Sequence, residues 1–376
     1  MLSVNWNYPT NIRFGCGRLA QLNQCCQELG INSPLLVTDA GLAQLPLITQ
    51  LLRDNPNFGL FADVRPNPVG QNVSDGVVAY RHGGHDGVIA MGGGSALDVG
   101  KAVALMVGQQ RPLWDFEDVG DNWKRVNQQG MAPVVAVPTT SGTGSEVGRC
   151  SVITDESTHT KRILFHPRML PALVLADPDT TLGLPPKLTA AVGMDALSHN
   201  LEAWCSPMLH PMADGIALEG MRLVQQSLVQ AYSMGGDRQA RSDMMAASTM
   251  GAAAFQKGLG AMHSLSHPIG ALFDTHHGLT NAVVMPYVLI HNAPAIGPKM
   301  ERLARYLGIS SVLEWVLELR RLLEIPHTLA ELGVTLESIP DLAQRAVADP
   351  TAATNPLPLT VPDCQQMLEK AWHGQL

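Results

Sequence analysis

Residues 87–105 read Gly87-Val88-Ile89-Ala90-Met91-Gly92-Gly93-Gly94-Ser95-Ala96-Leu97-Asp98-Val99-Gly100-Lys101-Ala102-Val103-Ala104-Leu105. The apolar run at the start predicts a buried strand, and the Ala- and Val-rich end predicts a helix. Glycines allow the backbone to approach a phosphate closely, and free N–H groups at a helix start attract an anion. Ser95 followed by Asp98 predicts a capping box. The segment therefore predicts a phosphate-binding turn; the alternative is a tight turn without a ligand.

A second loop of this kind spans residues 138–146 and reads Pro138-Thr139-Thr140-Ser141-Gly142-Thr143-Gly144-Ser145-Glu146. It directly follows an apolar run, and its hydroxyls and glycines suit the phosphate, ribose or amide of a nucleotide. Two such loops at the carboxyl ends of strands are what an open α/β sheet presents to a nucleotide. In the G-x-G-x-x-G fingerprint the acidic residue that binds the ribose follows the glycines. Here the candidate acid, Asp39, precedes them by about fifty residues, so the segment is not that fingerprint.

Asp39 ends the apolar run 34–39. A carboxylate there accepts hydrogen bonds from an adenosine ribose and repels a 2′-phosphate, which favours NAD over NADP. The alternative is a simple turn residue before Ala40 and Gly41.

The two halves of the chain differ in their hydrophobic pattern. Residues 34–39, 87–91, 132–137 and 172–176 are near-continuous apolar runs, which is typical of parallel strands covered on both faces. Residues 109–130 are polar and predict a loop with short structure. After Pro185 and Pro186 the period becomes helical, over 188–204, 213–232, 238–255 and 300–307. We therefore expect a Rossmann-like α/β nucleotide-binding domain over residues 1–184 and an all-α domain over residues 185–376.

The helical half carries a set of metal-ligand residue types. Asp195 and His199 lie four residues apart, as do His263 and His267, so each pair shares one helix face. His276 and His277 follow. Oxygen and nitrogen ligands without thiolate suit Zn²⁺ or Fe²⁺. The alternative is a set of surface pairs, but the segments are apolar and Ala-rich, and a buried carboxylate needs a partner.

Composition excludes several classes. The net charge of −8 over 376 residues argues against nucleic acid or an anionic membrane as a partner. No apolar run is long enough for a transmembrane helix, and residues 1–8 lack the basic and apolar regions of a signal peptide. The six cysteines form no C-x-x-C pair, which indicates reduced thiols and a cytoplasmic protein.

Four motifs, in order and spacing, resemble the iron-containing (group III) alcohol dehydrogenase family. They are Gly92-Gly93-Gly94-Ser95 with Asp98 and Lys101, the loop 138–146, Gly193-Met194-Asp195-Ala196-Leu197-Ser198-His199, and residues 260–270 with His277-Gly278-Leu279-Thr280-Asn281. The resemblance covers nearly the whole chain and weakens after about residue 310. It implies a nucleotide-binding α/β domain, a helical domain of dehydroquinate-synthase-like architecture, a cleft between them, and a homodimer.

The resemblance also implies roles for residues. The implied metal ligands are Asp195, His199, His263 and His277, although spacing alone ranks His267 above His277. His267 then takes a second, catalytic role in substrate contact or proton relay, and His276 is not a ligand. Combined with the loop patterns, the candidate cofactor-binding residues are Asp39, Gly92, Gly93, Gly94, Ser95, Asp98, Thr139, Thr140, Thr143 and Lys161.

The expected function is a metal-dependent, NAD(P)-linked dehydrogenase acting on a small primary alcohol or its aldehyde. Phe255 and Lys257 are candidate substrate residues, because Lys257 departs from the family pattern and brings a cation near the expected pocket. That cation suits an anionic substrate such as a 3-deoxy-octulosonate sugar acid; the alternative is a lysine extending to solvent. Other functions to weigh are a polyol dehydrogenase, a dehydroquinate-synthase-like lyase, a metal-dependent hydrolase and a non-catalytic metal-binding protein.

Overall fold

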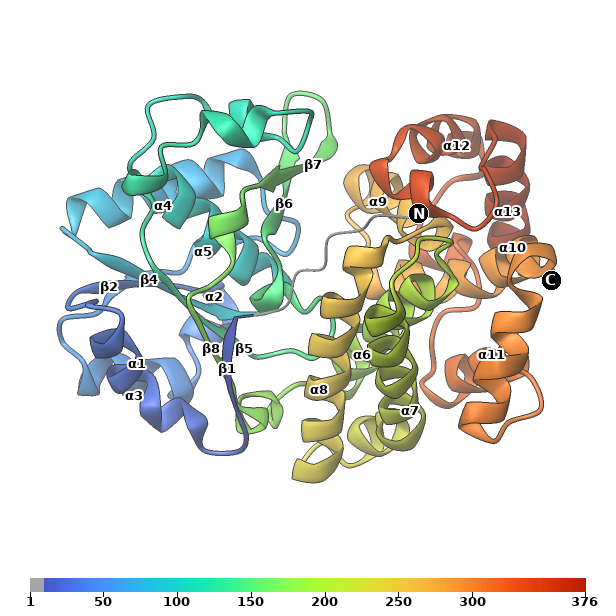
Figure 1. Cartoon of the computed structure of the whole chain (residues 1–376), viewed down its shortest axis with the longest axis horizontal. Coiled ribbons are helices and arrows are strands. Elements are labelled where there is room, and N and C mark those ends of the chain that lie inside the picture. The colour runs from blue at the N-terminus through green and yellow to red at the C-terminus, as the bar shows by residue number, and fades with distance from the viewer. Residues whose placement is uncertain (1–9) are drawn as a thin grey trace. The chain divides into compact units, whose positions relative to one another are not determined.

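The computed structural model describes residues 10–376 (Figure 1), which form two compact units. An α/β unit comprises residues 10–140 and Gly144–Leu182, and a helical unit comprises Gly183–Leu376 together with Ser141–Thr143. The short Ser141–Thr143 segment thus groups with the helical unit, whereas the sequence pattern places it in the first domain. Residues 1–8, on which the absence of a signal peptide was predicted, lie outside the described residues.

The α/β unit is built on a six-stranded sheet in which every pairing is parallel. Its strands, in spatial order, are β1 (Asn11–Phe14), β8 (Leu173–Ala176), β5 (Val134–Pro138), β4 (Gly87–Gly92), β2 (Pro34–Val37) and β3 (Gly59–Phe61). The four apolar runs of the sequence are β2, β4, β5 and β8, so that prediction is confirmed. The short edge strands β1 and β3 were not predicted, because each has too few residues to show a pattern.

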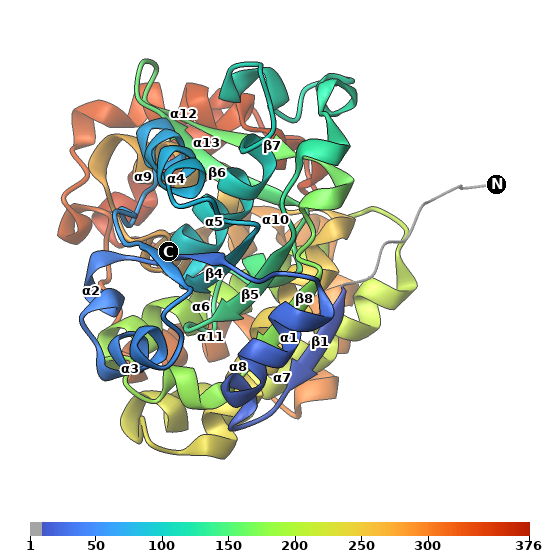
Figure 2. The same ribbon diagram turned by 90° about the vertical axis from the view of Figure 1, so that its left-hand side faces the viewer.

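Helices cover both faces of this sheet (Figure 2). On one face, α1 (Leu22–Glu28) and α3 (Pro46–Asp54) supply Leu22, Cys25 and Ile48 to a buried cluster with Ile89 and Val135. On the other face lie α5 (Gly94–Met106) and α4 (Gly70–His82), and a Cβ on Gly100 would lie 2.5 Å from Ala90 Cβ. Because strand side chains alternate between faces, strands buried on both faces are apolar throughout.

The predicted capping box at Ser95 is wrong. Helix α5 begins at Gly94, its N-cap is Gly93, and no side chain caps it. Asp98 instead tethers an antiparallel hairpin of β6 (Cys150–Asp155) and β7 (Thr160–Phe165), because its Oδ2 accepts a hydrogen bond of 2.9 Å from the Val152 N–H. The buried Lys101 ammonium lies 3.3 Å from Asp98 Oδ1 and donates to the Ser145 carbonyl at 2.9 Å. The polar segment 109–130 is a loop with short 3₁₀ turns and an isolated bridge from Glu117 to Leu164, which agrees with the predicted loop with short structure.

The helical unit contains no strand between residues 183 and 376. Its helices are α6 (Pro186–Cys205), α7 (Pro211–Ser233), α8 (Arg238–Ala254), α9 (Ala261–Phe273), α10 (His277–Leu307), α11 (Val312–Leu322), α12 (Ile339–Ala348) and α13 (Val361–His373). Helix α6 is central, since it packs against α7, α8 and α10 and is buried on all sides from Gly193 onward. Within the described residues, no helix has the length and apolarity needed to cross a membrane.

Candidate functional site

The carboxyl ends of β2, β4 and β5 lie side by side, because β4 pairs with both of the other strands. The chain reverses its direction of progress across the sheet at β2 and β4, since β3 lies on one side of β2 and β4 on the other. Such a switch point is where open α/β sheets bind nucleotides. The residues that follow these three strands include Asp39, Gly93 and Thr139, so the structure brings the three predicted segments together.

The glycine turn after β4 is closely packed against the loop after β5. Gly92 has φ +149°, which L-residues rarely adopt, and its carbonyl accepts a 2.9 Å hydrogen bond from the Thr139 N–H. A Cβ on Gly93 would lie 3.4 Å from Thr140 Cγ2. Helix α5 then begins at Gly94 with unsatisfied N–H groups, which is the arrangement that receives a phosphate.

Asp39 combines the two roles that the sequence left open. It is the N-cap of the short helix α2 (Ala40–Ala43), and its Oδ1 accepts a 2.8 Å hydrogen bond from the Leu42 N–H. Its Oδ2 has no hydrogen-bond partner among residues 10–376 and faces the glycine turn, where a Cβ on Gly92 would lie 3.8 Å away. One oxygen is therefore structural, and the other remains available to a ligand at the sheet edge.

The remaining candidate cofactor residues are less closely grouped. Ser95 Oγ donates to the Pro66 carbonyl, and both oxygens of Asp98 are engaged inside the protein by Ser145 and Val152. Lys161 lies on β7 opposite Thr154. Thr143 belongs to the helical unit.

The structure brings the four candidate metal ligands together inside the helical unit. Asp195 and His199 come from α6, His263 from the first turn of α9, and His277 from the first residue of α10. One ligand atom from each residue lies within 4.8 Å of the other three. His277 Nε2 is 3.7 Å and His199 Nε2 is 3.9 Å from Asp195 Oδ1. The neighbouring His276 is exposed and outside this cluster.

The donor set fits a divalent ion. One carboxylate oxygen and three imidazole nitrogens are ligands that Zn²⁺ and Fe²⁺ accept, and these atoms are close enough to share one ion. Burial lowers the pKa of His199 to about 4 despite the neighbouring Asp195 carboxylate, so its ring is neutral at physiological pH. A neutral imidazole keeps the lone pair that a metal requires.

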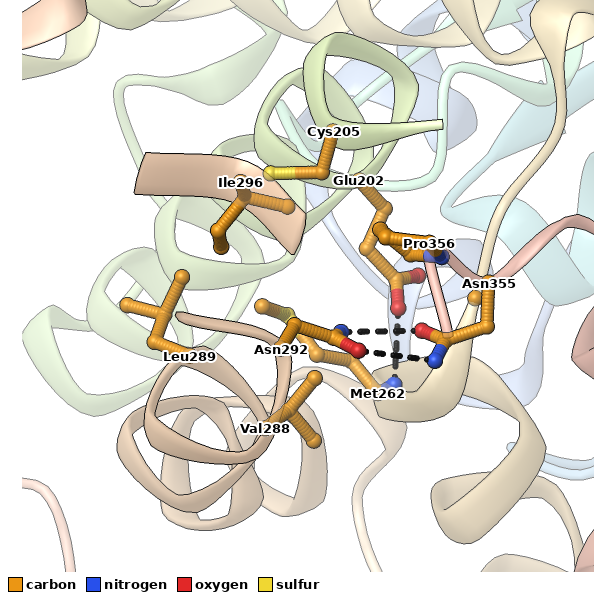
Figure 3. A pocket seen from close by; sticks show the side chains of 10 residues that line it. Glu202, Cys205, Met262, Val288, Leu289, Asn292, Ile296, Asn355 and Pro356 are labelled. Carbon is orange, nitrogen blue, oxygen red and sulfur yellow. Dashed lines mark hydrogen bonds between the residues drawn. The ribbon is translucent and has the colours of Figure 1, made fainter. Parts of the chain in front are cut away.

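Glu202, which Figure 3 shows bonded to Met262, also supports His263 and was not singled out from the sequence. Its Oε2 lies 2.5 Å from His263 Nδ1, and its Oε1 accepts a 2.7 Å hydrogen bond from the Met262 N–H. Burial lowers the pKa of His263, but the carboxylates of Glu202, Asp195 and Asp349 together raise it by more, so the net shift is upward. A carboxylate behind a ligating histidine fixes the ring and strengthens it as a ligand. Glu202 lies one turn beyond His199, which is the only signal that the sequence gives for it.

The first turn of α9 is held by side chains from distant segments, because its N-cap Gly260 has no side chain to offer. Besides the bond from Met262 to Glu202, the Ala261 N–H donates to Asn355 Oδ1 at 3.0 Å. Asn355 and Asn292 exchange two amide hydrogen bonds of 2.9 Å, visible in Figure 3 beside a pocket that Glu202 also lines. These contacts satisfy helix-end N–H groups and fix His263, which is in the same turn.

His267 lies outside the ligand cluster but against it. Its ring stacks on His277, with centroids 5.5 Å apart. Its Nδ1 is 2.9 Å from Asp349 Oδ2, and Asp349 Oδ1 accepts from the Thr351 N–H at 2.9 Å. Burial raises the pKa of Asp349, but His267 and Thr351 lower it by more. An ionised Asp349 holds the proton of His267 on Nδ1, which leaves Nε2 as an acceptor.

The expectation that Lys257 extends to solvent is wrong. Lys257 is 3% exposed, and its ammonium forms an ion pair with Asp214 and donates to the Trp204 carbonyl at 3.3 Å. Lys299 donates to the Trp204 and Ser206 carbonyls, each at 2.8 Å, so both lysines cap the end of α6. The Asp214 pairing leaves Lys257 no unpaired charge for an anionic substrate. Phe255, by contrast, lies edge-on to His199, with ring centroids 5.2 Å apart.

A glycine-rich turn at the end of a parallel strand and a carboxylate–histidine cluster on helices are the parts that a metal- and nucleotide-dependent enzyme requires. Family models agree: that of iron-containing alcohol dehydrogenases matches residues 9–178, and the C-terminal model of the same family matches residues 189–372. The chain belongs to the iron-containing alcohol dehydrogenase family, whose enzymes use NAD and a metal.

Relatives match over nearly their full length. The 4-hydroxybutyrate dehydrogenase of Cupriavidus necator is 37% identical over 97% of this chain and 98% of its own. The 1,3-propanediol dehydrogenase of Citrobacter freundii is 33% identical over 91% of this chain and 92% of its own. A solved 1,3-propanediol oxidoreductase superposes with a TM-score of 0.92 at 32% identity, covering 99% and 100% of the chains. A solved sulfoacetaldehyde reductase from Bifidobacterium kashiwanohense in complex with NAD⁺ superposes with a TM-score of 0.90 at 28% identity, covering 99% of each chain.

Proposed function

We propose that this chain is an NAD-preferring dehydrogenase that interconverts a small primary alcohol and its aldehyde, with one Fe²⁺ or Zn²⁺ held by Asp195, His199, His263 and His277. The observation that carries the proposal is the approach of these four ligand atoms to within 4.8 Å of one another. The glycine turn after β4 and the Thr139–Thr140 segment after β5 supply the nucleotide contacts, with Gly92 and Gly93 allowing close approach.

The bound metal supplies a Lewis acid that makes the substrate hydroxyl easier to deprotonate, and the nicotinamide supplies the hydride acceptor. The protein's residues supply position and proton transfer. Glu202 fixes the orientation of His263 through Nδ1. His267 receives the released proton on Nε2, because Asp349 holds the other ring nitrogen as a donor. Phe255 packs an apolar edge against His199 and limits the space around it.

The substrate that we propose carries a second polar group at some distance from the alcohol carbon. Support comes from the relatives, whose names specify 4-hydroxybutyrate, 1,3-propanediol and sulfoacetaldehyde. The argument for a sugar-acid substrate depended on an unpaired Lys257 cation. That ammonium is paired with Asp214, so Lys257 does not favour a sugar acid.

The decisive experiment is NADH formation by metal-loaded protein with ethanol, 1,3-propanediol, 4-hydroxybutyrate and a sugar acid bearing a primary alcohol. We expect an alcohol-dependent NADH signal that disappears after chelation. A lyase of related architecture would bind NAD without net NADH formation, and a hydrolase would not bind it. Alcohol oxidation that persists in metal-stripped protein would refute the metal role.

The NAD preference is tested at Asp39. Replacing Asp39 with Gly should raise the ratio of kcat/KM for NADP to that for NAD by about tenfold or more, a change of about 1.4 kcal/mol. The reason is that a carboxylate at this edge repels a 2′-phosphate. Asp39→Asn is the matched variant, since an amide can still cap α2 without the charge. An unchanged ratio in both variants removes Asp39 from cofactor selection.

The proton relay is tested at Asp349. Asp349→Asn should lower kcat by about 10- to 100-fold, because general acid–base assistance contributes about 10²–10⁴ in rate and the His267 ring loses its charged partner. Metal content should stay the same, since Asp349 is not a ligand. Asp237→Asn is the control, because Asp349 is the N-cap of the 3₁₀ helix Pro350–Thr354 and Asp237 is likewise the N-cap of a helix, α8. Equal kcat values for the two variants would exclude the relay.

We also propose a homodimer in the cytoplasm. None of the six cysteines, all within the described residues, forms a disulfide, which supports a reducing compartment. Sedimentation of the purified protein measures its oligomeric state, and a monomer would refute the proposed dimer.

A further inference from the structure

Asn281 is a fifth polar residue at the candidate metal cluster. It lies on α10, one helical turn after His277, and is 0% exposed. Side chains at this spacing share one helix face, so Asn281 and His277 point toward the same part of α6. It has the i,i+4 spacing of the ligand pairs, but an amide is not among the ligand types that the sequence pointed to.

The Asn281 amide contacts three of the four candidate ligands. Its Nδ2 lies 3.0 Å from Asp195 Oδ1, 3.1 Å from His277 Nε2 and 3.4 Å from His263 Nε2. It also lies 3.4 Å from Ser198 Oγ, which is not a candidate ligand. The three candidate ligand atoms are those that would face an ion. The amide therefore sits at the cluster itself rather than behind one ligand, unlike Glu202.

The other end of the amide makes no compensating bond. Asn281 Oδ1 is buried and has no hydrogen-bond partner among residues 10–376. Burying an unpaired amide oxygen is unfavourable, and the polar contacts of this side chain are made through Nδ2 alone. An imidazole nitrogen that binds a metal has no lone pair left for an N–H donor. The acceptor that can serve both a metal and Asn281 is Asp195 Oδ1, because a carboxylate oxygen has two lone pairs.

We propose that Asn281 is a positioning residue of the metal site, which holds Asp195 Oδ1 in the cluster through a neutral donor. The inference rests on the metal site of the proposed function. A hydrogen-bond donor on a ligating carboxylate fixes its orientation and strengthens binding. The neutral amide also keeps the cluster at one negative charge, whereas a carboxylate in its place would repel Asp195 at 3 Å and attract a cation.

The first test is Asn281→Ala with Zn²⁺ alone as the probe, measured by competition against a chromophoric chelator. We expect the Kd for Zn²⁺ to rise about 10- to 100-fold, the usual effect of removing a partner of a metal ligand. The control is Asn200→Ala. Asn200 is equally buried on ligand helix α6 and also has an unpartnered Oδ1, but its Nδ2 donates to the Ala196 and Ala247 carbonyls, at 2.8 and 3.0 Å.

The second test is Asn281→Asp, which reverses the expected direction and guards against a failure of the alanine variant to fold. We expect its Tm in a chelator to fall below that of the wild type, because two carboxylates then face each other. We expect the rise in Tm on adding Zn²⁺ to exceed the rise in the wild type. A purely structural asparagine would lower Tm equally with and without Zn²⁺.

The outcomes separate this inference from the proposed function. Wild-type protein that binds no Zn²⁺ would refute the metal site and this inference with it. Zn²⁺ binding by the wild type, with Asn281→Ala as tight as Asn200→Ala, would overturn the inference alone. So would an Asn281→Asp variant whose Tm rise on adding Zn²⁺ is no larger than that of the wild type.

Discussion

Replacing His263 with Ala is expected to abolish metal binding and turnover while NAD binding persists. His263 presents Nε2 to the cluster, and its Nδ1 is anchored by Glu202. Losing a ligand should cost more than the roughly 10- to 100-fold typical of losing an outer partner. Apart from Thr143, the candidate cofactor residues lie in the α/β unit, which this substitution does not touch. Elemental analysis and a fluorescence titration with NADH measure the two effects separately.

The matched control is His276→Ala. This histidine directly precedes the ligand His277, but it is the exposed N-cap residue of α10 and lies outside the cluster. Its variant should keep the metal content and kcat of the wild type. Full metal content and activity in the His263→Ala protein would refute the ligand assignment.

Replacing Gly278 with Ala should disrupt the same cluster through the backbone. A Cβ on Gly278 would lie 2.2 Å from the Ala191 carbonyl oxygen and 3.0 Å from Asp195 Cβ. Helices α6 and α10 would have to separate where Asp195 and His277 meet. Overpacking of this kind lowers the free energy of unfolding by about 1–3 kcal/mol. We also expect metal affinity to fall at least as far as in Asn281→Ala, because the displaced helices carry two ligands.

Gly297→Ala on the same helix is the control. Apart from its chain neighbours and its own helix backbone, no atom lies within 4 Å of a Cβ at this position. Alanine should therefore raise stability by about 0.4–1 kcal/mol through its better helix propensity and lower unfolded-state entropy. Urea unfolding and Zn²⁺ titration of both variants measure the contrast. Equal stability and equal Zn²⁺ affinity would mean that α6 and α10 do not need this close contact.

The hydrophobic pattern of the sequence predicted those strands and helices that have a long apolar run or a clear period. The apolar runs at 34–39 and 87–91 are parallel strands, since burial on both faces leaves no alternation. The hairpin at 150–165 escaped prediction, because it is attached by Asp98 and partly exposed rather than buried on both faces. The capping box failed because Gly93 is already the N-cap of α5, so Ser95 comes two positions too late.

The ligand set shows where local spacing stops being informative. The i,i+4 rule placed Asp195 with His199 correctly on one face, but it favoured His267 over His277. In the structure, α9 ends at Phe273 and the chain turns back through Asp274, in a left-handed conformation with φ +52°. This turn brings His277 to the cluster. His267 instead forms a hydrogen bond with Asp349 through Nδ1.

The sequence by itself determined an α/β half with a glycine turn at a strand end, a helical half, and the supply of carboxylate and imidazole groups. It could do so because hydrophobic period and helical spacing are local properties. Tertiary structure alone decided which partners complete the chemistry: Glu202 behind His263, Asn281 beside Asp195, and Asp214 against Lys257. These pairs join different helices, and only the packing of one helix on another brings their atoms within bonding distance.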